Sequence, residues 1–332
     1  MNKTPHFCLS LATMLALGFN PSATLAADGP SYHLVKEIAV GGPGSWDYLS
    51  VDAAARRLYV SHGTKAVVID LDKDEVAGEI TDTPGIHGIA LAPELGLAFT
   101  SNGRENKASV VDLKTLQTKS RIETGANPDA ILFDPSLSEL YTFNGRGSSA
   151  TVIDAKGLKV ITTIQLGGKP EFAVLDAKAG RIYNNLEDKS ETLAIDTKTH
   201  QVVNRWPIAP GKEPSALAID EEHHRLFIGC GNQIMAMMDS TSGKVITTVP
   251  IGNGVDACSF DSGAQLAFSS CADGTVTIAH EDSPEKLSVV QSLKTEPGAK
   301  TMTLDPKTHR IYLGAGSRNA PNSFKILVFA PK

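Results

Sequence analysis

The stretch YLSVDAAARRLYVSHG at residues 48–63 sets the pattern that decides the fold. It has the character of two short strands joined by a turn, with Asp52 closing the first strand and the aromatic Tyr59 seven positions later in the second. The pattern returns six more times along the chain, every 40 to 44 residues. The first strands end at Asp52, Ala92, Asp134, Asp176, Asp220, Asp261 and Asp305, and the aromatic residues are Tyr59, Phe99, Tyr141, Tyr183, Phe227, Phe268 and Tyr312.

Each repeat contains four strand-length apolar segments bounded by Gly, Pro, Asn and Asp turns, and no segment sustains a helical period. A repeat of this length and composition predicts an all-β fold, a seven-bladed β-propeller of four-stranded blades. The last repeat ends after its third strand, FKILVF at residues 324–329. The segment HLVKEIAVGG at residues 33–42 matches the missing fourth strand. We therefore expect the N-terminal strand to complete the last blade and close the ring.

The segments RLYVS at residues 57–61 and LAFTSN at residues 97–102 resemble the YVTN-type repeat of YncE-like seven-bladed propellers. The resemblance covers residues 33–330, although Leu186, Cys230 and Ala315 depart from the asparagine that ends the motif. It implies the propeller fold. It leaves the function open, because propellers serve as lyases, lactonases, dehydrogenases and pure binding platforms.

Residues 1–26 have the features of a secretory signal peptide. Lys3 supplies the positive charge, residues 7–19 are mostly apolar, and Thr24 and Ala26 are small residues placed for cleavage after Ala26. We expect a propeller domain at residues 27–332 that is periplasmic or secreted. The chain has 332 residues and a net charge of −6, with no run of 18 apolar residues and no basic stripe. These features argue against nucleic-acid binding and membrane insertion.

The chain lacks a G-x-G-x-x-G motif, a P-loop and a C-x-x-C-H haem motif, which disfavours nucleotide hydrolysis and bound c-type haem. A closed ring has no free strand edge to pair, so we expect a monomer. The recurring aspartate at the end of each first strand is interpreted as structural, because its side chain can accept hydrogen bonds from the N–H groups of the following turn.

Polar residues recur where the first strand of each blade begins and the second ends, at one mouth of the channel. The residues five positions before the end of the first strand are Asp47, His87, Asp129, Glu171, Ser215, Asp256 and Lys300. Those ten positions after it are His62, Asn102, Asn144, Leu186, Cys230, Cys271 and Ala315. Neighbouring polar or aromatic residues are Trp46, Arg104, Arg146, Glu187 and Glu213. The predicted cross-strand pairs are Asp47 with His62, His87 with Asn102, Asp129 with Asn144, and Asp256 with Cys271.

This mouth is the candidate binding site. The predicted ligand-binding residues are Trp46, Asp47, His62, His87, Asn102, Arg104, Asp129, Asn144, Arg146, Glu171 and Asp256. A divalent metal ion is a candidate cofactor, with Asp47, His62, His87 and Asp129 as candidate ligands, because imidazoles and carboxylates bind such ions. The alternative is that these groups cap strand ends and pair with one another across blades.

Three functional hypotheses remain open at this point. The first is a binding platform for a small molecule or a periplasmic or extracellular protein. The second is a metal-dependent lactone hydrolase or lyase in which His62 or His87 acts as the base. The third is a purely structural propeller.

Other chemically notable residues have simpler interpretations. Cys230 and Cys271 occupy the same register in adjacent blades, so a disulfide between them stays open, and Cys258 is expected to be a small buried apolar residue. The histidines at residues 223–224 are interpreted as part of a solvated turn. The segment His-Glu-Asp at residues 280–282 is interpreted as a loop.

Overall fold

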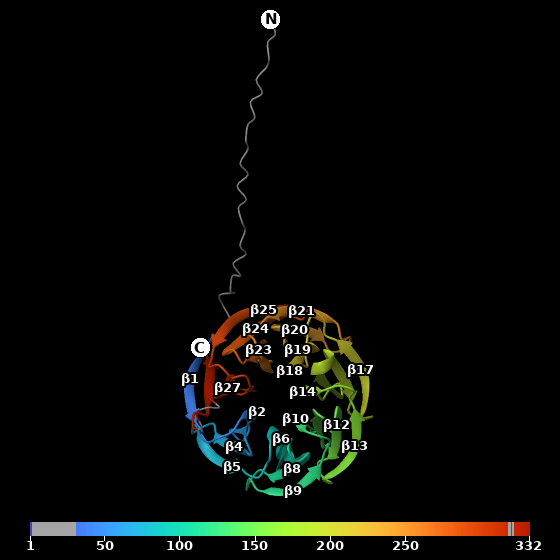
Figure 1. Ribbon diagram of the computed structural model, residues 1–332, viewed down its shortest axis with the longest axis vertical. Helices are drawn as coiled ribbons and strands as arrows, with labels where there is room; N and C mark the ends of the chain where they lie inside the picture. Colours follow the sequence, from blue (N-terminus) through green and yellow to red (C-terminus); the bar gives the residue numbers. More distant parts are fainter. Residues whose placement is uncertain (2–30, 318–319, 321) are drawn as a thin grey trace.

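The computed structural model describes residue 1, residues 31–317, residue 320 and residues 322–332. The predicted signal peptide, residues 1–26, falls outside this part of the chain apart from Met1. Seven four-stranded antiparallel sheets stand around a central channel as the blades of a propeller (Figure 1). The predicted fold class is confirmed.

The first strand of each blade lies innermost and the chain then moves outward strand by strand. Blade 1 contains β2 (Trp46–Asp52), β3 (Arg57–His62), β4 (Lys65–Asp70) and β5 (Glu75–Ile80). Blade 2 contains β6 (Ile86–Ala92), β7 (Leu97–Asn102), β8 (Lys107–Asp112) and β9 (Thr118–Glu123). Blade 3 contains β10 (Pro128–Asp134), β11 (Glu139–Asn144), β12 (Ser149–Asp154) and β13 (Lys159–Gln165). Blade 4 contains β14 (Pro170–Asp176), β15 (Arg181–Leu186), β16 (Glu191–Asp196) and β17 (Gln201–Pro207).

The remaining blades follow the same plan. Blade 5 contains β18 (Pro214–Asp220), β19 (Arg225–Cys230), β20 (Ile234–Asp239) and β21 (Val245–Pro250). Blade 6 contains β22 (Val255–Asp261), β23 (Leu266–Cys271), β24 (Thr275–Ser283) and β25 (Lys286–Lys294). Blade 7 contains β26 (Met302–Asp305), β27 (Arg310–Ala315), β28 (Lys325–Pro331) and β1 (Tyr32–Ala39). The helices of the described residues are two short 3-10 turns, Pro93–Leu95 and Glu187–Lys189, and none of these helices is long enough to cross a bilayer.

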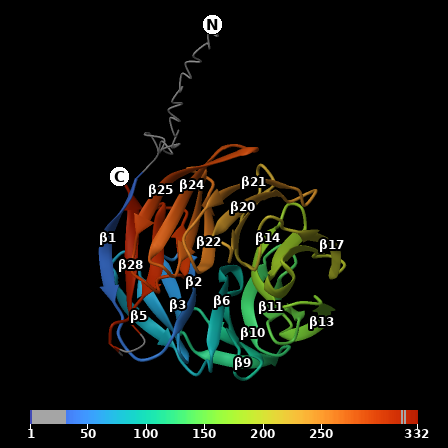
Figure 2. The same cartoon turned by 45° about the horizontal axis from the view of Figure 1, so that its top comes forward.

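The N-terminal strand closes the ring as expected. β1 pairs antiparallel with β28, with Tyr32 opposite Pro331 and Ile38 opposite Ile326. Figure 2 shows β1 at the outer edge of blade 7, beside β28. The Tyr32 hydroxyl donates a hydrogen bond to the carbonyl of His309 at 2.8 Å. The two ends of the propeller are therefore held in one sheet.

The core lies between neighbouring blades. The recurring aromatic residue of each repeat is buried at these interfaces, as with Phe99 of blade 2 against Leu140 of blade 3, and Tyr312 of blade 7 against Val60 of blade 1. Each such ring removes a large apolar area from water, which explains why the repeat keeps an aromatic residue at this position.

The recurring aspartate is structural, as its position suggested. In blade 1 Asp52 Oδ1 accepts hydrogen bonds from the N–H groups of Ala54 and Ala55, at 3.1 and 2.8 Å. Equivalent side chains bond the following turn at Asp134, Asp176, Asp220, Asp261 and Asp305. Blade 2 has Ala92 instead and makes this turn as a 3-10 segment that begins at Pro93.

Two sequence-based interpretations need correction. Residues 280–282 lie within β24 and are not a loop, because β24 and β25 of blade 6 are nine residues long, whereas β20, the equivalent of β24 in blade 5, has six. His223 lies in a turn, but its ring contacts buried carboxylates.

The three cysteines of the described chain, Cys230, Cys258 and Cys271, are buried and unbridged.

Candidate functional site

A β-bulge near the start of the first strand recurs in blades 1 to 6 and determines what faces the channel mouth. In blade 1 Trp46 pairs with His62 and Leu49 with Val60, so Asp47 and Tyr48 oppose a single residue, Ser61. The N–H of Asp47 donates to Ser61 Oγ at 2.9 Å. Because a bulge re-aims the side chain of the extra residue, Asp47 is directed into the mouth.

The bulge also makes the four predicted cross-strand pairs wrong by one position. The extra residue moves the partner one place earlier in the first strand, a shift that repeat spacing alone does not reveal. The observed pairs are Trp46 with His62, Ile86 with Asn102, Pro128 with Asn144, and Val255 with Cys271.

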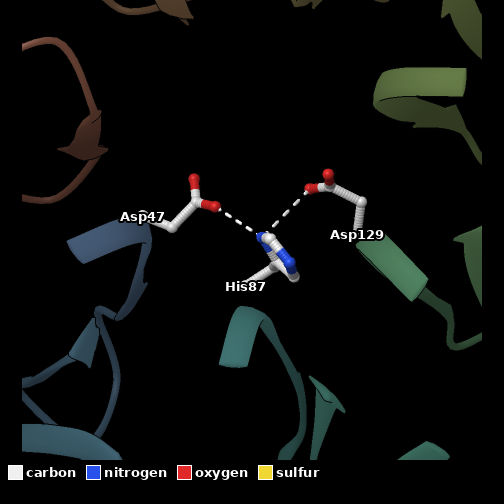
Figure 3. Close-up of side chains that lie close together, drawn as sticks. All are labelled: Asp47, His87 and Asp129. Carbon is white, nitrogen blue, oxygen red and sulfur yellow. Dashed lines mark hydrogen bonds and ion pairs between the residues drawn. The ribbon is translucent and has the colours of Figure 1, made fainter. Parts of the chain in front are cut away.

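Three of the four candidate metal ligands meet at the mouth. Asp47, His87 and Asp129 come from β2, β6 and β10 of three consecutive blades and point toward one another (Figure 3). His87 Nδ1 lies 2.7 Å from Asp47 Oδ2 and 3.7 Å from Asp129 Oδ1. One donor atom from each residue lies within 4.8 Å of the other two. We call these three residues the mouth cluster.

The ring of His87 fits against its own blade because residue 103 is glycine. A Cβ atom at Gly103 would lie 2.7 Å from His87 Nε2, closer than such atoms approach. The Nε2 edge of the imidazole therefore faces the turn after β7, and the Nδ1 edge faces the two carboxylates. Glycine at this position leaves the imidazole directed toward the channel.

Beside the mouth cluster is a cavity of about 270 Å³. Asp47 and Asp129 line it together with Glu171, Asp256 and Lys300. Lys300 Nζ lies 2.8 Å from Asp256 Oδ2. Lys169 Nζ lies 2.7 Å from Glu171 Oε1 and also pairs with Glu187. Four carboxylates therefore surround a small polar cavity.

The crowding of carboxylates changes their acidity. Burial, reinforced by the charges of Asp47 and Asp256, raises the pKa of Asp129 to about 6. Burial also raises the pKa of Glu171 to about 7 and raises that of Asp256 despite the neighbouring Lys300. Burial works against the charged form of His87, but the Asp47 hydrogen bond and the surrounding carboxylates outweigh it and raise the His87 pKa. The mouth thus favours added positive charge.

Two aromatic rings form the floor of the mouth. Tyr48 of blade 1 and Phe172 of blade 4 approach across the channel, with ring centroids 5.0 Å apart. Both rings, with Met302, also line a second cavity of about 470 Å³ deeper in the channel, whose other walls are mostly apolar. The rings therefore lie between a polar mouth and an apolar lower channel.

The residues at the ends of the second strands do not line the mouth cavity. His62, a candidate metal ligand and base, is buried and stacks on Phe324 with ring centroids 4.3 Å apart. Burial lowers its pKa. The Asn102 side chain donates to Ser109 Oγ at 2.8 Å, and the Asn144 side chain donates to Thr151 Oγ1 at 3.0 Å. These asparagines pair within their own blades, and not across blades as the structural alternative proposed.

The other candidates divide between the cavity and the rim. Trp46 lines the cavity and stacks on Phe324, with ring centroids 4.9 Å apart. Arg104 and Arg146 are exposed and do not line it. Tyr48 and Phe172 were missed, although both lie four positions before the end of their first strands, a shared register that could have identified them.

The comparisons with known proteins support the fold alone. No family model matches the chain, and no curated protein sequence matches it. A solved structure entitled "Kuenenia stuttgartiensis Hydrazine Synthase" is similar in fold, with a TM-score of 0.72 and 16% sequence identity over 94% of this chain and 98% of that chain. Membership of the YVTN-repeat family stays a prediction.

Proposed function

We propose that this protein is a binding protein that holds a divalent metal ion at the mouth of its channel through Asp47, His87 and Asp129. The observation that carries the proposal is the convergence of these three side chains, from three different blades, with their donor atoms within 4.8 Å of one another. A mixed imidazole and carboxylate set favours a transition-type ion such as Zn²⁺ or Mn²⁺ over Ca²⁺ or Mg²⁺, which prefer oxygen ligands alone.

The ion would exchange with a proton. His87 Nδ1 makes a 2.7 Å hydrogen bond to Asp47, and this nitrogen is the one that faces both carboxylates. Metal ligation requires the nitrogen to be unprotonated, so binding would release that proton and place the charge of the ion between the two aspartates.

The cavity beside the cluster is the proposed place for a small polar ligand. A volume of about 270 Å³ suits a small metabolite. Lys300 and the ion would both attract a carboxylate or carbonyl oxygen, and the rings of Tyr48 and Phe172 close the cavity below. We therefore propose that the ligand bound at this mouth is a small molecule with an anionic or carbonyl oxygen.

The test measures the affinity of chelator-treated protein for Zn²⁺ and Mn²⁺ by titration calorimetry. The variant His87→Ala should bind the ion at the mouth at least about 100-fold more weakly, because loss of a ligand exceeds the usual cost of losing a supporting residue. The matched control is Asp256→Asn, which alters a mouth carboxylate that pairs with Lys300 and lies outside the cluster. Equal affinity in the His87→Ala variant would refute the proposal.

A metal-dependent lactone hydrolase or lyase is the second candidate, and one observation favours it. The pKa of Glu171, raised to about 7 by burial, suits a general base at neutral pH. His62 does not line the cavity, and the Nδ1 of His87 is directed at the aspartates, so Glu171 replaces them as the proposed base. Lactone turnover that needs added metal and is lost in Glu171→Gln would support this activity. If no lactone in a panel is turned over, the enzymatic candidate is refuted and only the binding role remains.

We further infer that the protein is a monomer exported to the periplasm or cell exterior and related to the YVTN-repeat propellers. The support is the signal-like pattern at residues 1–26 and the repeat pattern of the first two strands. Cell fractionation of the full chain tests the location, and light scattering tests the assembly.

A further inference from the structure

A second histidine–carboxylate cluster lies at the interface of blades 5 and 6. Asp220 ends β18, His223 follows in the turn to β19, and Glu281 belongs to β24 of the next blade. His223 Nδ1 lies 2.6 Å from Asp220 Oδ2 and 3.5 Å from Glu281 Oε1. Donor atoms of the three residues lie within 4.8 Å of one another. We call these residues the interblade cluster.

The Glu281 carboxylate is buried, and its oxygens receive no hydrogen bond from the residues that the structure describes. Glu281 is 4% exposed as a whole residue. Within the described residues, neither its Oε1 nor its Oε2 receives a hydrogen bond. Asp220 beside it is 2% exposed. Asp220 accepts a hydrogen bond from the Glu222 N–H and contacts His223, whereas Glu281 is opposed only by the nearby charges of His223 and Arg225. A buried carboxylate whose oxygens receive no hydrogen bond is unfavourable in a protein interior. A cation bound between the two carboxylates would offset this negative charge.

The geometry of the cluster is held by the blades themselves. The longer β24 and β25 of blade 6 extend Glu281 to the turn of blade 5. Arg225, at the start of β19, donates from Nε to the carbonyl of Pro284 at 2.6 Å and so fixes the β24–β25 turn against blade 5. The second guanidinium contact, Nη1 to Asp239 Oδ2 at 2.8 Å, directs Arg225 toward its own blade. The turn that follows Glu281 is therefore held against blade 5, while the hydrogen bonds of Arg225 go to Pro284, His224 and Asp239.

We propose that the interblade cluster binds a transition-type divalent ion, with Zn²⁺ as the best fit, and that the ion joins blade 5 to blade 6. Asp220 Oδ2, His223 Nδ1 and a Glu281 oxygen supply the nitrogen and carboxylate ligands that Zn²⁺ takes. The side chain of His223 is 34% exposed, so an ion can enter from solvent and keep a water ligand on that side. This site is separate from the mouth cluster and needs none of its residues.

The next interface offers a natural control. Asp261 ends β22 as Asp220 ends β18, and it pairs with His309 of blade 7 with Oδ2 and Nδ1 2.6 Å apart. Asp261 and His309 belong to none of the three-ligand groups found in the described residues. A histidine–aspartate pair of the same kind is thus present without the third ligand.

The experiment uses the full chain carrying His87→Ala, so that the mouth cluster does not contribute to the measured Zn²⁺ binding. Failure of the interblade site can then be distinguished from failure of the mouth site. Chelator-treated protein is titrated with Zn²⁺, with bound metal measured by mass spectrometry after dialysis and unfolding followed by thermal denaturation. Adding Glu281→Gln should weaken the remaining Zn²⁺ binding at least about 100-fold and abolish the rise in melting temperature that Zn²⁺ produces. Adding Asp261→Asn instead should change neither the Zn²⁺ affinity nor the rise in melting temperature that Zn²⁺ produces.

Crystals soaked in Zn²⁺ provide a readout independent of variant stability. An anomalous peak in contact with Asp220, His223 and Glu281 supports the site. The proposal is overturned if the His87→Ala protein takes up no Zn²⁺, if Glu281→Gln leaves its Zn²⁺ uptake unchanged, or if the anomalous map shows no peak between these residues. In that case Asp220 and Glu281 share a proton.

Discussion

The mouth cluster and the interblade cluster use the same chemistry in different surroundings. Each places a histidine between two carboxylates from different strands. At the mouth the side chains of Asp47, His87 and Asp129 are 31%, 27% and 18% exposed. In the interblade cluster the two carboxylates, Asp220 and Glu281, are only 2% and 1% exposed. Both clusters offer an imidazole and two carboxylates, and the burial of the carboxylates distinguishes them.

The difference indicates separate roles. Metal sites that act on ligands keep an open position, whereas structural sites are closed by the protein. The mouth cluster opens onto a cavity, so an ion there remains available to a ligand. The two carboxylates of the interblade cluster are enclosed between β24 and the turn after β18, and only the His223 side is open to solvent, so an ion there would mainly stabilise the contact between blades. The following changes test this contrast.

The largest effect is expected from Arg225→Ala, which frees the β24–β25 turn that encloses the interblade cluster. Arg225 is 9% exposed and bonds Pro284, His224 and Asp239. Its loss should lower the free energy of unfolding by about 2–3 kcal/mol, because buried bonds to a charged group are lost. Urea denaturation measures this.

The matched control for that change is Arg181→Ala. Arg181 begins β15 as Arg225 begins β19, and it pairs with Asp196 of its own blade. Its side chain is 33% exposed, so its loss should cost less than about 1 kcal/mol. An equal loss in the free energy of unfolding for the two variants would show that the Arg225–Pro284 contact between blades 5 and 6 adds no stability.

Glu281→Gln should stabilise the metal-free protein at pH 8 by about 1–2 kcal/mol, because it removes a buried charge that receives no hydrogen bond from the described residues. Asp129→Asn at the mouth should change the free energy of unfolding by less, because Asp129 is more exposed and lies near His87. Denaturant unfolding in the presence of a chelator compares the two. Destabilisation by Glu281→Gln would contradict the view that this carboxylate lacks compensation.

Gly103→Ala should weaken metal binding at the mouth about tenfold, an effect of the size seen when a supporting residue is lost. The added Cβ would lie 2.7 Å from His87 Nε2 and must displace the ring. Gly145→Ala is the control, because a Cβ at that equivalent position in blade 3 meets nothing nearer than 3.4 Å. Calorimetric titration with Zn²⁺ should show no change in the interblade cluster for either variant.

The smallest effect is expected at His62, the candidate ligand that is buried against Phe324. Burial lowers its pKa below 6.5, so the unfolded chain takes up a proton more readily than the folded protein, and stability falls as the pH drops below 6.5. His62→Phe should raise the free energy of unfolding by about 1 kcal/mol at neutral pH and by more at pH 5. His33→Phe, at an exposed position, is the control, and a parallel pH profile for both variants would refute this.

The fold was predictable because its signals are periodic. An aspartate that bonds its own turn and an aromatic residue buried between blades recur in register, and both have local physical causes visible in the sequence. Closure by β1 was predictable for the same reason, since residues 33–42 repeat the pattern of an outer strand.

The candidate site was only partly predictable. Asp47, His87 and Asp129 were identified because they share a register, but the bulge that aims Asp47 depends on cross-strand pairing, which the repeat spacing does not show. His62 was misplaced because its ring packs on Phe324, a contact between distant parts of the chain. Glu281 was missed because blade 6 has longer outer strands than its neighbours.

The pairing of β1 with β28 has a consequence for synthesis. β1 must wait until β28 has been made, since Tyr32 pairs with Pro331. As the chain emerges, six blades can form in turn while β1 remains without its partner, and the ring closes only after β28 has emerged. A chain interrupted before Lys325 would keep an open sheet edge at each end of an incomplete ring, and such edges pair readily with other chains. Translation through β28 is therefore needed before both edges of the ring are paired.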